Sequence, residues 1–200
     1  MELIAPVAIG LNPYIGTFLL AAFAAFTGRL PESELTAAVP QTALVGLVFV
    51  SGAAAAGELV LGKFVRFAPR VRRVSQIVAP ISAGLWAAAL EQSELPSPVV
   101  AVGAAVLAWA VSATLTALAA RASRSPLWVG LGHIPILMAA ATASACIIPL
   151  ALARPSFSAQ LAIGSLVVLA LAAFVGWRPG GAPATPAPRG IGIIGRSPSR

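Results

Sequence analysis

The sequence predicts an all-α polytopic membrane protein, a bundle of about six transmembrane helices with both termini in the cytoplasm. Of its 200 residues, 58% are hydrophobic and only 10% are charged, whereas a soluble domain carries roughly 25% charged residues. The apolar residues form six long runs, and the basic residues gather in alternate links between them. Too few polar residues remain to cover a water-soluble domain, so we expect the lipid bilayer to surround most of the chain.

The six apolar runs follow one another with short polar links between them. A spanning helix needs roughly 20 mostly apolar residues, and all six runs reach or approach this length. None of them alternates apolar and polar residues as a half-buried strand does. They make up a transmembrane domain over residues 1–177 and are, in order, Leu3–Thr27, Thr42–Leu61, Val74–Leu90, Val99–Ala120, Leu127–Ala153 and Ser158–Trp177.

Composition changes abruptly after Trp177. Residues 178–200 are rich in Pro, Gly, Ala and Arg, and such a segment cannot bury enough apolar surface to fold. We therefore expect a disordered, basic cytoplasmic tail. At the other end, the first run lacks the basic residues that begin a cleaved signal peptide and is longer than its apolar stretch. We expect this run to be retained.

The basic residues are unevenly distributed over the links. The even-numbered links and the tail hold eleven of them, and the odd-numbered links hold two. Positively charged short loops stay in the cytoplasm, so this alternation predicts that both termini are inside. It also explains the net charge of +7 without a nucleic-acid partner. The abundance of Arg and Ala is typical of GC-rich bacteria, and we expect a multi-pass protein of the inner membrane.

The largest basic cluster lies in the second link, before the third run begins at Val74. Membrane topology alone explains it. The alternative is contact with anionic lipid headgroups, to which each basic residue near the surface contributes about 1 kcal/mol. The cluster consists of Lys63, Arg66, Arg70, Arg72 and Arg73.

The first run is interrupted by Gly10-Leu11-Asn12-Pro13. Asn is a good helix N-cap and Pro fits the first helical position, so a short helix or re-entrant segment can end here and a second helix can begin at Pro13. Discontinuous helices of this kind form binding sites in transporters. The sequence nevertheless favours the simpler alternative, one spanning helix with a proline kink.

Glu58 is the only acidic residue within a run, near the cytoplasmic end of the second helix. A carboxylate in a bilayer is costly, so it is usually paired or functional. Its position near the interface favours an ion pair with Lys63 or Arg66 over a proton or cation site.

His133 is the only histidine and lies two turns into the expected fifth helix. Its imidazole can titrate near neutral pH or relay a proton. A hydrogen bond to a backbone carbonyl is favoured, because Pro135 leaves the carbonyl of Leu131 free.

Small residues recur four positions apart, as in Gly52 and Ala56 or Ala140 and Ser144. This spacing allows close helix approach in lipid and favours either a tight bundle or a homo-oligomer. Trp109 falls in the middle of a run, so we expect it to pack between helices.

No catalytic motif is present. The chain has no Asp, one His and one Cys, so it lacks paired aspartates and cannot build a zinc site alone. The phosphate-binding loop of ATPases and the Gly-x-Ser-x-Gly turn of hydrolases are also missing. We expect no enzymatic activity, no cofactor and no metal.

Two segments resemble a bacterial family of multi-pass membrane proteins named domain of unknown function 4126. They are Gly10-Leu11-Asn12-Pro13-Tyr14 and Gly57-Glu58-Leu59-Val60 with Lys63, followed by Ser75 to Pro80 and Gly84. The chain departs from the family pattern at Gly62 and Ala79, where the family has Asp and Arg. It departs again at Gly132 and His133, where members of the family have an acidic pair. The resemblance implies a membrane protein and no particular activity.

The expected function is a small channel or secondary transporter, or a subunit of one. Its polar intramembrane residues would be Asn12, Pro13, Glu58 and His133. The alternative is a structural or lipid-interacting membrane protein without transport activity.

Overall fold

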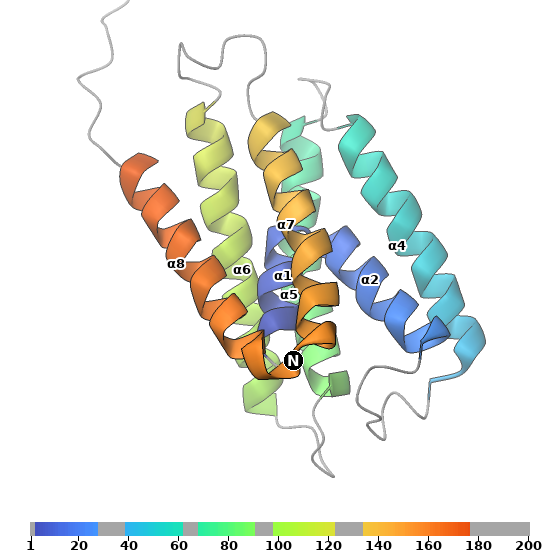
Figure 1. Ribbon diagram of the computed structural model, residues 1–200. Coiled ribbons are helices and arrows are strands. Elements are labelled where there is room, and N and C mark those ends of the chain that lie inside the picture. Colours follow the sequence, from blue (N-terminus) through green and yellow to red (C-terminus); the bar gives the residue numbers. More distant parts are fainter. Residues whose placement is uncertain (1–2, 28–38, 62–67, 91–97, 123–133, 177–200) are drawn as a thin grey trace, which may run out of the picture.

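The computed structural model describes residues 3–27, 39–61, 68–90, 98–122 and 134–176. Within these ranges the chain is helical apart from short connections, and it contains no strand. The elements, drawn in Figure 1, are α1 (Ile4–Leu11), α2 (Pro13–Phe26), α4 (Gln41–Leu61), α5 (Ala68–Leu90), α6 (Pro98–Ala122), α7 (Ile134–Ala153), the 3-10 turn η2 (Pro155–Phe157) and α8 (Ser158–Gly176). The predicted all-α architecture is confirmed.

Three of these helices are long and apolar enough to cross a membrane: α4, residues 98–120 of α6, and α7. The outside of the bundle is apolar as well, since large side chains such as Phe49, Leu85 and Phe174 are 72%, 69% and 76% exposed. Soluble monomers rarely expose large contiguous apolar patches. This surface is consistent with a helical membrane protein.

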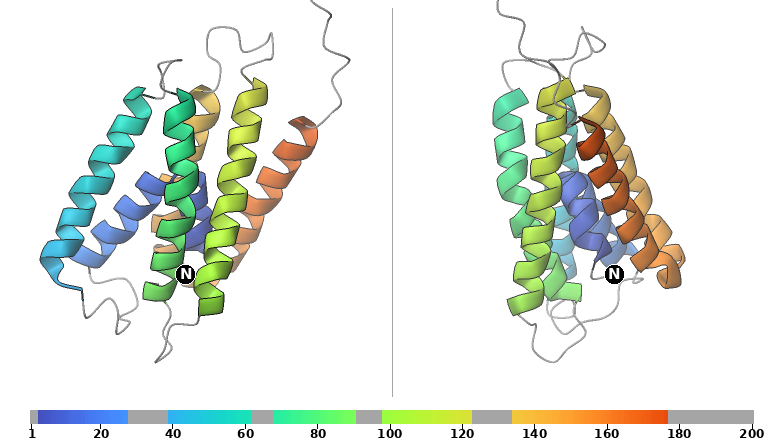
Figure 2. Two further views of the ribbon diagram at one scale, coloured as in Figure 1. Left: turned by 180° about the vertical axis from the view of Figure 1, so that it is seen from behind. Right: turned by 90° about the vertical axis from the view of Figure 1, so that its left-hand side faces the viewer.

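Helix α1 occupies the centre of the bundle. All its residues from Ile4 to Gly10 are buried, and it contacts α2, α5, α6, α7 and α8. Helix α2 then runs back toward the end of the bundle at which α1 began, as Figures 1 and 2 show. The two helices therefore form a hairpin whose tip lies inside the bundle.

The residues at the hairpin tip explain why the helix breaks there. Asn12 has an extended backbone (φ −150°, ψ 108°), and its side chain accepts a hydrogen bond from the backbone N–H of Ile15. This is the N-cap geometry that leaves one less N–H unsatisfied at the start of a helix. Pro13 follows at the first helical position, where its missing N–H costs nothing.

Two glycines allow the hairpin to pack closely. A Cβ at Gly16 would lie 2.9 Å from Cα of Ile9, so α2 can approach α1 this closely only without a side chain there. A Cβ at Gly10 would lie 2.7 Å from Cβ of Val111, which sets the approach of α1 to α6. Ser144 of α7 adds a buried hydrogen bond of 2.9 Å to the carbonyl of Ala8.

The favoured expectation for the first run, one spanning helix with a proline kink, is wrong. The extended backbone of Asn12 ends α1, and α2 turns back instead of continuing in the same direction. The prediction of six spans with both termini on one side is not confirmed. The N-terminal end of α1 and the C-terminal end of α8 lie at opposite ends of the bundle (Figure 1).

The remaining helices follow the predicted runs. α4, α6 and α8 agree with the second, fourth and sixth runs to within a few residues, and these helices alternate in direction with α5 and α7 (Figure 2). α5 begins earlier than its run, at Ala68, and so includes three of the arginines of the basic cluster. Trp109 is 55% exposed on α6, which contradicts the expectation that it packs between helices.

Candidate functional site

A polar cluster joins the hairpin tip to two neighbouring helices. Asn12 precedes α2, Glu58 lies near the end of α4, and Ser75 lies in the second turn of α5. Asn12 Nδ2 donates a hydrogen bond of 2.7 Å to Glu58 Oε2. Ser75 Oγ donates one of 2.8 Å to Glu58 Oε1. Each carboxylate oxygen therefore accepts one hydrogen bond from a buried side chain.

The amino terminus of α2 favours negative charge at this place. Asn12 caps that terminus, and the first turn of a helix carries a partial positive charge. The carboxylate of Glu58 reaches the cap residue itself, so the helix dipole and the Asn12 amide act on it together. Within the described ranges, Glu58 has no ion pair; Lys63 and Arg66, the partners predicted for it, lie outside them.

An open cavity of about 370 Å³ adjoins Glu58 between α2, α4 and α5. Tyr14, Glu58 and Arg70 contribute the polar groups of its lining, and the other lining residues are apolar or glycine. Arg70 lies in the first turn of α5, so this cavity is close to the end of the bundle at which α5 begins. Glu58 is partly exposed and lines this cavity.

The structure brings three of the predicted site residues together, namely Asn12, Pro13 and Glu58. Pro13 is buried at the start of α2, where its role is to begin the helix. His133 lies outside the described residues, so its predicted role is not tested. Ser75 was not predicted as a site residue, because nothing in the sequence indicates that it faces a carboxylate 17 positions earlier.

The described part of the basic cluster lies at the start of α5. Arg70 and Arg73 are exposed and Arg72 is half-buried, so the first two are accessible to a lipid headgroup. Their contact with anionic lipid remains a prediction. Among the described residues no group of three His, Cys, Asp or Glu side chains could hold a metal ion.

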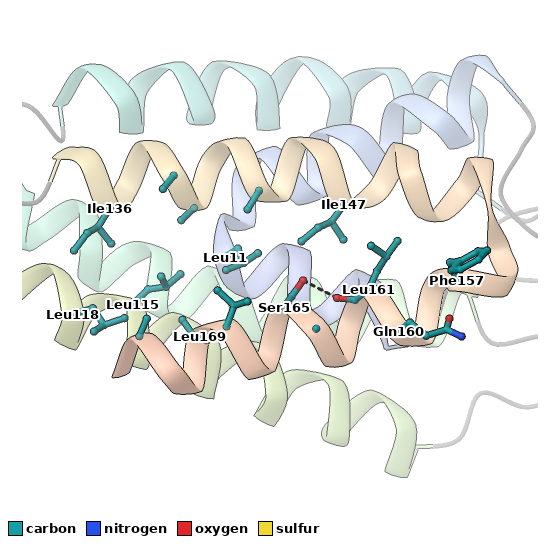
Figure 3. A pocket seen from close by; sticks show the side chains of 16 residues that line it. Leu11, Leu115, Leu118, Ile136, Ile147, Phe157, Gln160, Leu161, Ser165 and Leu169 are labelled. Atoms are coloured by element: carbon teal, nitrogen blue, oxygen red, sulfur yellow. Dashed lines mark hydrogen bonds between the residues drawn. The ribbon is translucent and has the colours of Figure 1, made fainter. Parts of the chain in front are cut away.

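A second, larger cavity of about 650 Å³ lies between α6, α7 and α8. Leucine and isoleucine side chains of these helices, together with Leu11 of α1, point into it (Figure 3). Gln160 and Ser165 are the polar lining residues, and Ser165 Oγ donates to the carbonyl of Leu161 at 2.7 Å. Such a lining suits an apolar chain better than a polar solute.

No family model, no curated protein and no solved structure matches the chain. The resemblance to the domain of unknown function 4126 therefore remains a prediction.

Proposed function

We propose that this protein is a small secondary transporter of the bacterial inner membrane in which Glu58 is the ion-binding group. The observation that supports this most directly is the contact between Glu58 and the tip of a helical hairpin inside the bundle, through Asn12 at 2.7 Å. Discontinuous helices that meet a polar group near the midplane form the sites of many transporters. A carboxylate within a membrane-spanning segment is usually paired or functional, and the described partners of Glu58 are the neutral side chains of Asn12 and Ser75.

The buried position of α1 favours a transporter over a channel. The centre of the bundle, through which a pore would run, is filled by the seven consecutive buried residues from Ile4 to Gly10. An ion can reach Glu58 from the cavity beside Arg70, but continued passage requires the hairpin to move. Alternating access, in which one element shifts against the rest around a fixed site, needs such a movement.

We further propose that α4 to α8 cross the membrane and that α1 and α2 form a re-entrant hairpin. Two observations support this: α4 to α8 alternate in direction along the bundle (Figure 2), and the basic residues are unevenly distributed between its two ends. The links and tail that follow α4, α6 and α8, together with the start of α5 and the end of α6, hold eleven basic residues, and the other links hold two. Positive loops stay inside, so the C-terminus is cytoplasmic and the N-terminal end of α1 faces the opposite side.

Ion flux into proteoliposomes tests the transport function. The purified protein is reconstituted, and gradients of H⁺, Na⁺ and K⁺ are applied in turn while an enclosed indicator reports the ion. We expect wild type to transport at least one of these three ions. In Glu58→Gln the rate of that transport should fall at least about tenfold. Glu94→Gln, in the acidic link between the third and fourth runs, is the matched control and should behave as wild type. Absence of flux in wild type, or equal rates for Glu58→Gln, would contradict the proposal.

A lipid-binding role without transport is the second candidate, because the apolar cavity between α6, α7 and α8 has room for a hydrocarbon chain. Gly164 lines this cavity, and a Cβ added there meets no atom within 4 Å. Gly164→Leu should reduce the number of lipids retained in native mass spectra. Gly103→Leu, at an equally open position outside the cavity, is the control. Equal lipid retention in the two variants counts against this candidate.

A further inference from the structure

The orientation of the Asn12 amide is fixed by its role as a helix cap. The backbone N–H of Ile15 can only donate, so the atom 2.9 Å from it must be Asn12 Oδ1. Asn12 Nδ2, which carries two hydrogens and no lone pair available to a cation, then faces Glu58 Oε2. Oε2 is therefore an acceptor whether or not Glu58 is ionised, and any proton on the carboxyl group sits on Oε1.

The hydroxyl group of Ser75 lies within hydrogen-bond distance of two acceptors, Glu58 Oε1 and the carbonyl oxygen of Val71. Its Oγ lies 2.8 Å from Glu58 Oε1 and 3.1 Å from the carbonyl oxygen of Val71. A hydroxyl has one hydrogen and two acceptor lone pairs, so it donates to one of these oxygens at a time. When Glu58 is ionised, Ser75 donates to Oε1. When Oε1 carries a proton, Ser75 can donate to Val71 and accept from Glu58, with no movement of a heavy atom.

The same arrangement disfavours a metal cation. A cation needs several oxygen ligands around it, whereas the nearest side chain to Oε2 presents an amide N–H₂. The positive end of the α2 dipole adds to this, since it stabilises anions and not cations. A proton needs no further ligand, because it forms a covalent bond with Oε1.

We infer that Glu58 binds a proton on Oε1 and that Ser75 is the positioning residue that hydrogen-bonds both protonation states. The inference rests on the proposed transport function and names the ion that Glu58 binds. A hydronium ion in the adjoining cavity transfers its proton to Oε1, forming the O–H bond and leaving water; on release, that bond breaks and water takes the proton. The other titratable groups lining this cavity are Tyr14 of α2 and Arg70 of α5, and within the described residues α1 and α4 add none.

Infrared titration tests this inference independently of transport. A protonated carboxyl group has a carbonyl stretch that an ionised carboxylate lacks. Because five other glutamates give the same band, the contribution of Glu58 is the difference between the spectra of wild type and Glu58→Gln. We expect this difference band to appear on acidification of the full chain in lipid and to keep its midpoint when Na⁺ or K⁺ is added. A midpoint that falls as Na⁺ rises, or a Glu58 band missing at all pH values, would overturn the inference.

Variants at Asn12 and Ser75 test the assigned atoms. In Asn12→Ser, which keeps an N-cap, the carbonyl band should move to higher frequency because Oε2 loses its donor. Ser75→Ala should move the titration midpoint up by roughly one pH unit, since the ionised form loses the stronger, charge-assisted bond. Ser75→Thr should restore the wild-type midpoint, and Ser165→Ala, whose hydroxyl bonds within α8, should leave it unchanged. An unchanged midpoint in Ser75→Ala contradicts the role given to Ser75.

The two proposals fail in different ways. If Glu58 titrates as described but no ion moves into proteoliposomes, the transport function is wrong and the proton site stands. If Na⁺ flux depends on Glu58, the transport function stands and the proton inference is wrong.

Discussion

Asn12 Nδ2 lies 2.7 Å from Glu58 Oε2, although the two residues are 46 positions apart in the sequence. This contact joins the break between α1 and α2 to the end of α4. It depends on the hairpin, because only a chain that stops and turns back at Asn12 brings the first turn of α2 to this carboxylate. The candidate site and the unusual course of the first apolar run therefore have a common origin.

The close approach of the hairpin predicts that Gly16→Ala and Gly10→Ala destabilise the protein. The added Cβ would lie 2.9 Å from Cα of Ile9 in the first variant and 2.7 Å from Cβ of Val111 in the second. Overpacking of this kind costs about 1–3 kcal/mol, which thermal unfolding in detergent would detect. Gly103→Ala is the control, since nothing lies within 4 Å of its added Cβ; an equal melting temperature for all three variants would contradict the packing described.

The two functions of Asn12, cap and hydrogen-bond donor to Glu58, are separable by substitution. Asn12→Ala removes both and should cost about 1 kcal/mol of stability from the lost cap. Asn12→Ser retains the cap and removes only the contact with Glu58, so it should melt near wild type while ion flux through Glu58 changes. Thermal melts and flux on the same preparations check this. Equal melting of the two variants would show that the cap contributes nothing.

Ser144 links α7 to the central helix through the carbonyl of Ala8 at 2.9 Å. Hydrogen bonds between membrane helices contribute about 0.6 kcal/mol on average, so Ser144→Ala should lower stability by roughly that amount. Thr142→Ala is a suitable comparison, because its hydroxyl is exposed and bonds to Met138 within α7. A steric-trap or denaturant titration in detergent measures the difference, and the absence of any difference would mean that this bond does not stabilise the hairpin.

The arginines at the start of α5 predict a preference for anionic lipid. Replacing Arg70, Arg72 and Arg73 with Gln removes three positive charges, and the two exposed ones, Arg70 and Arg73, each contribute about 1 kcal/mol near an anionic surface. Native mass spectra should then show less retained phosphatidylglycerol and the same amount of phosphatidylcholine. Unchanged retention of both lipids would leave membrane orientation as the only role of this cluster.

The helices could be predicted because continuous apolarity is a local property of the sequence. The break at Asn12 and Pro13 could be predicted only as the less favoured alternative, because Pro13 suits both a kinked helix and the start of a new one. The direction taken by α2 could not be predicted, because the local sequence does not decide whether the chain continues or turns back after Asn12. That choice depends on contacts such as Gly10 with Val111, which are about a hundred positions apart.

The candidate site was predictable only in part for the same reason. Asn12 and Glu58 stand out as polar residues within apolar runs, but Ser75 follows a basic segment and looks like an ordinary surface residue. Its place beside Glu58 follows from how α4 and α5 pack. Trp109 shows the opposite error: its position in the middle of a run suggested burial between helices, whereas in a membrane the outward face of α6 is equally apolar.

The most direct test of the hairpin is the membrane side of the two chain ends. Tags at the N-terminus and C-terminus are probed in intact cells and in inverted vesicles with a reagent that does not cross the membrane. A hairpin followed by five crossing helices predicts that the tags lie on opposite faces, with the C-terminal tag in the cytoplasm. Two tags on the same face would contradict a re-entrant first run and, with it, the position given to Glu58.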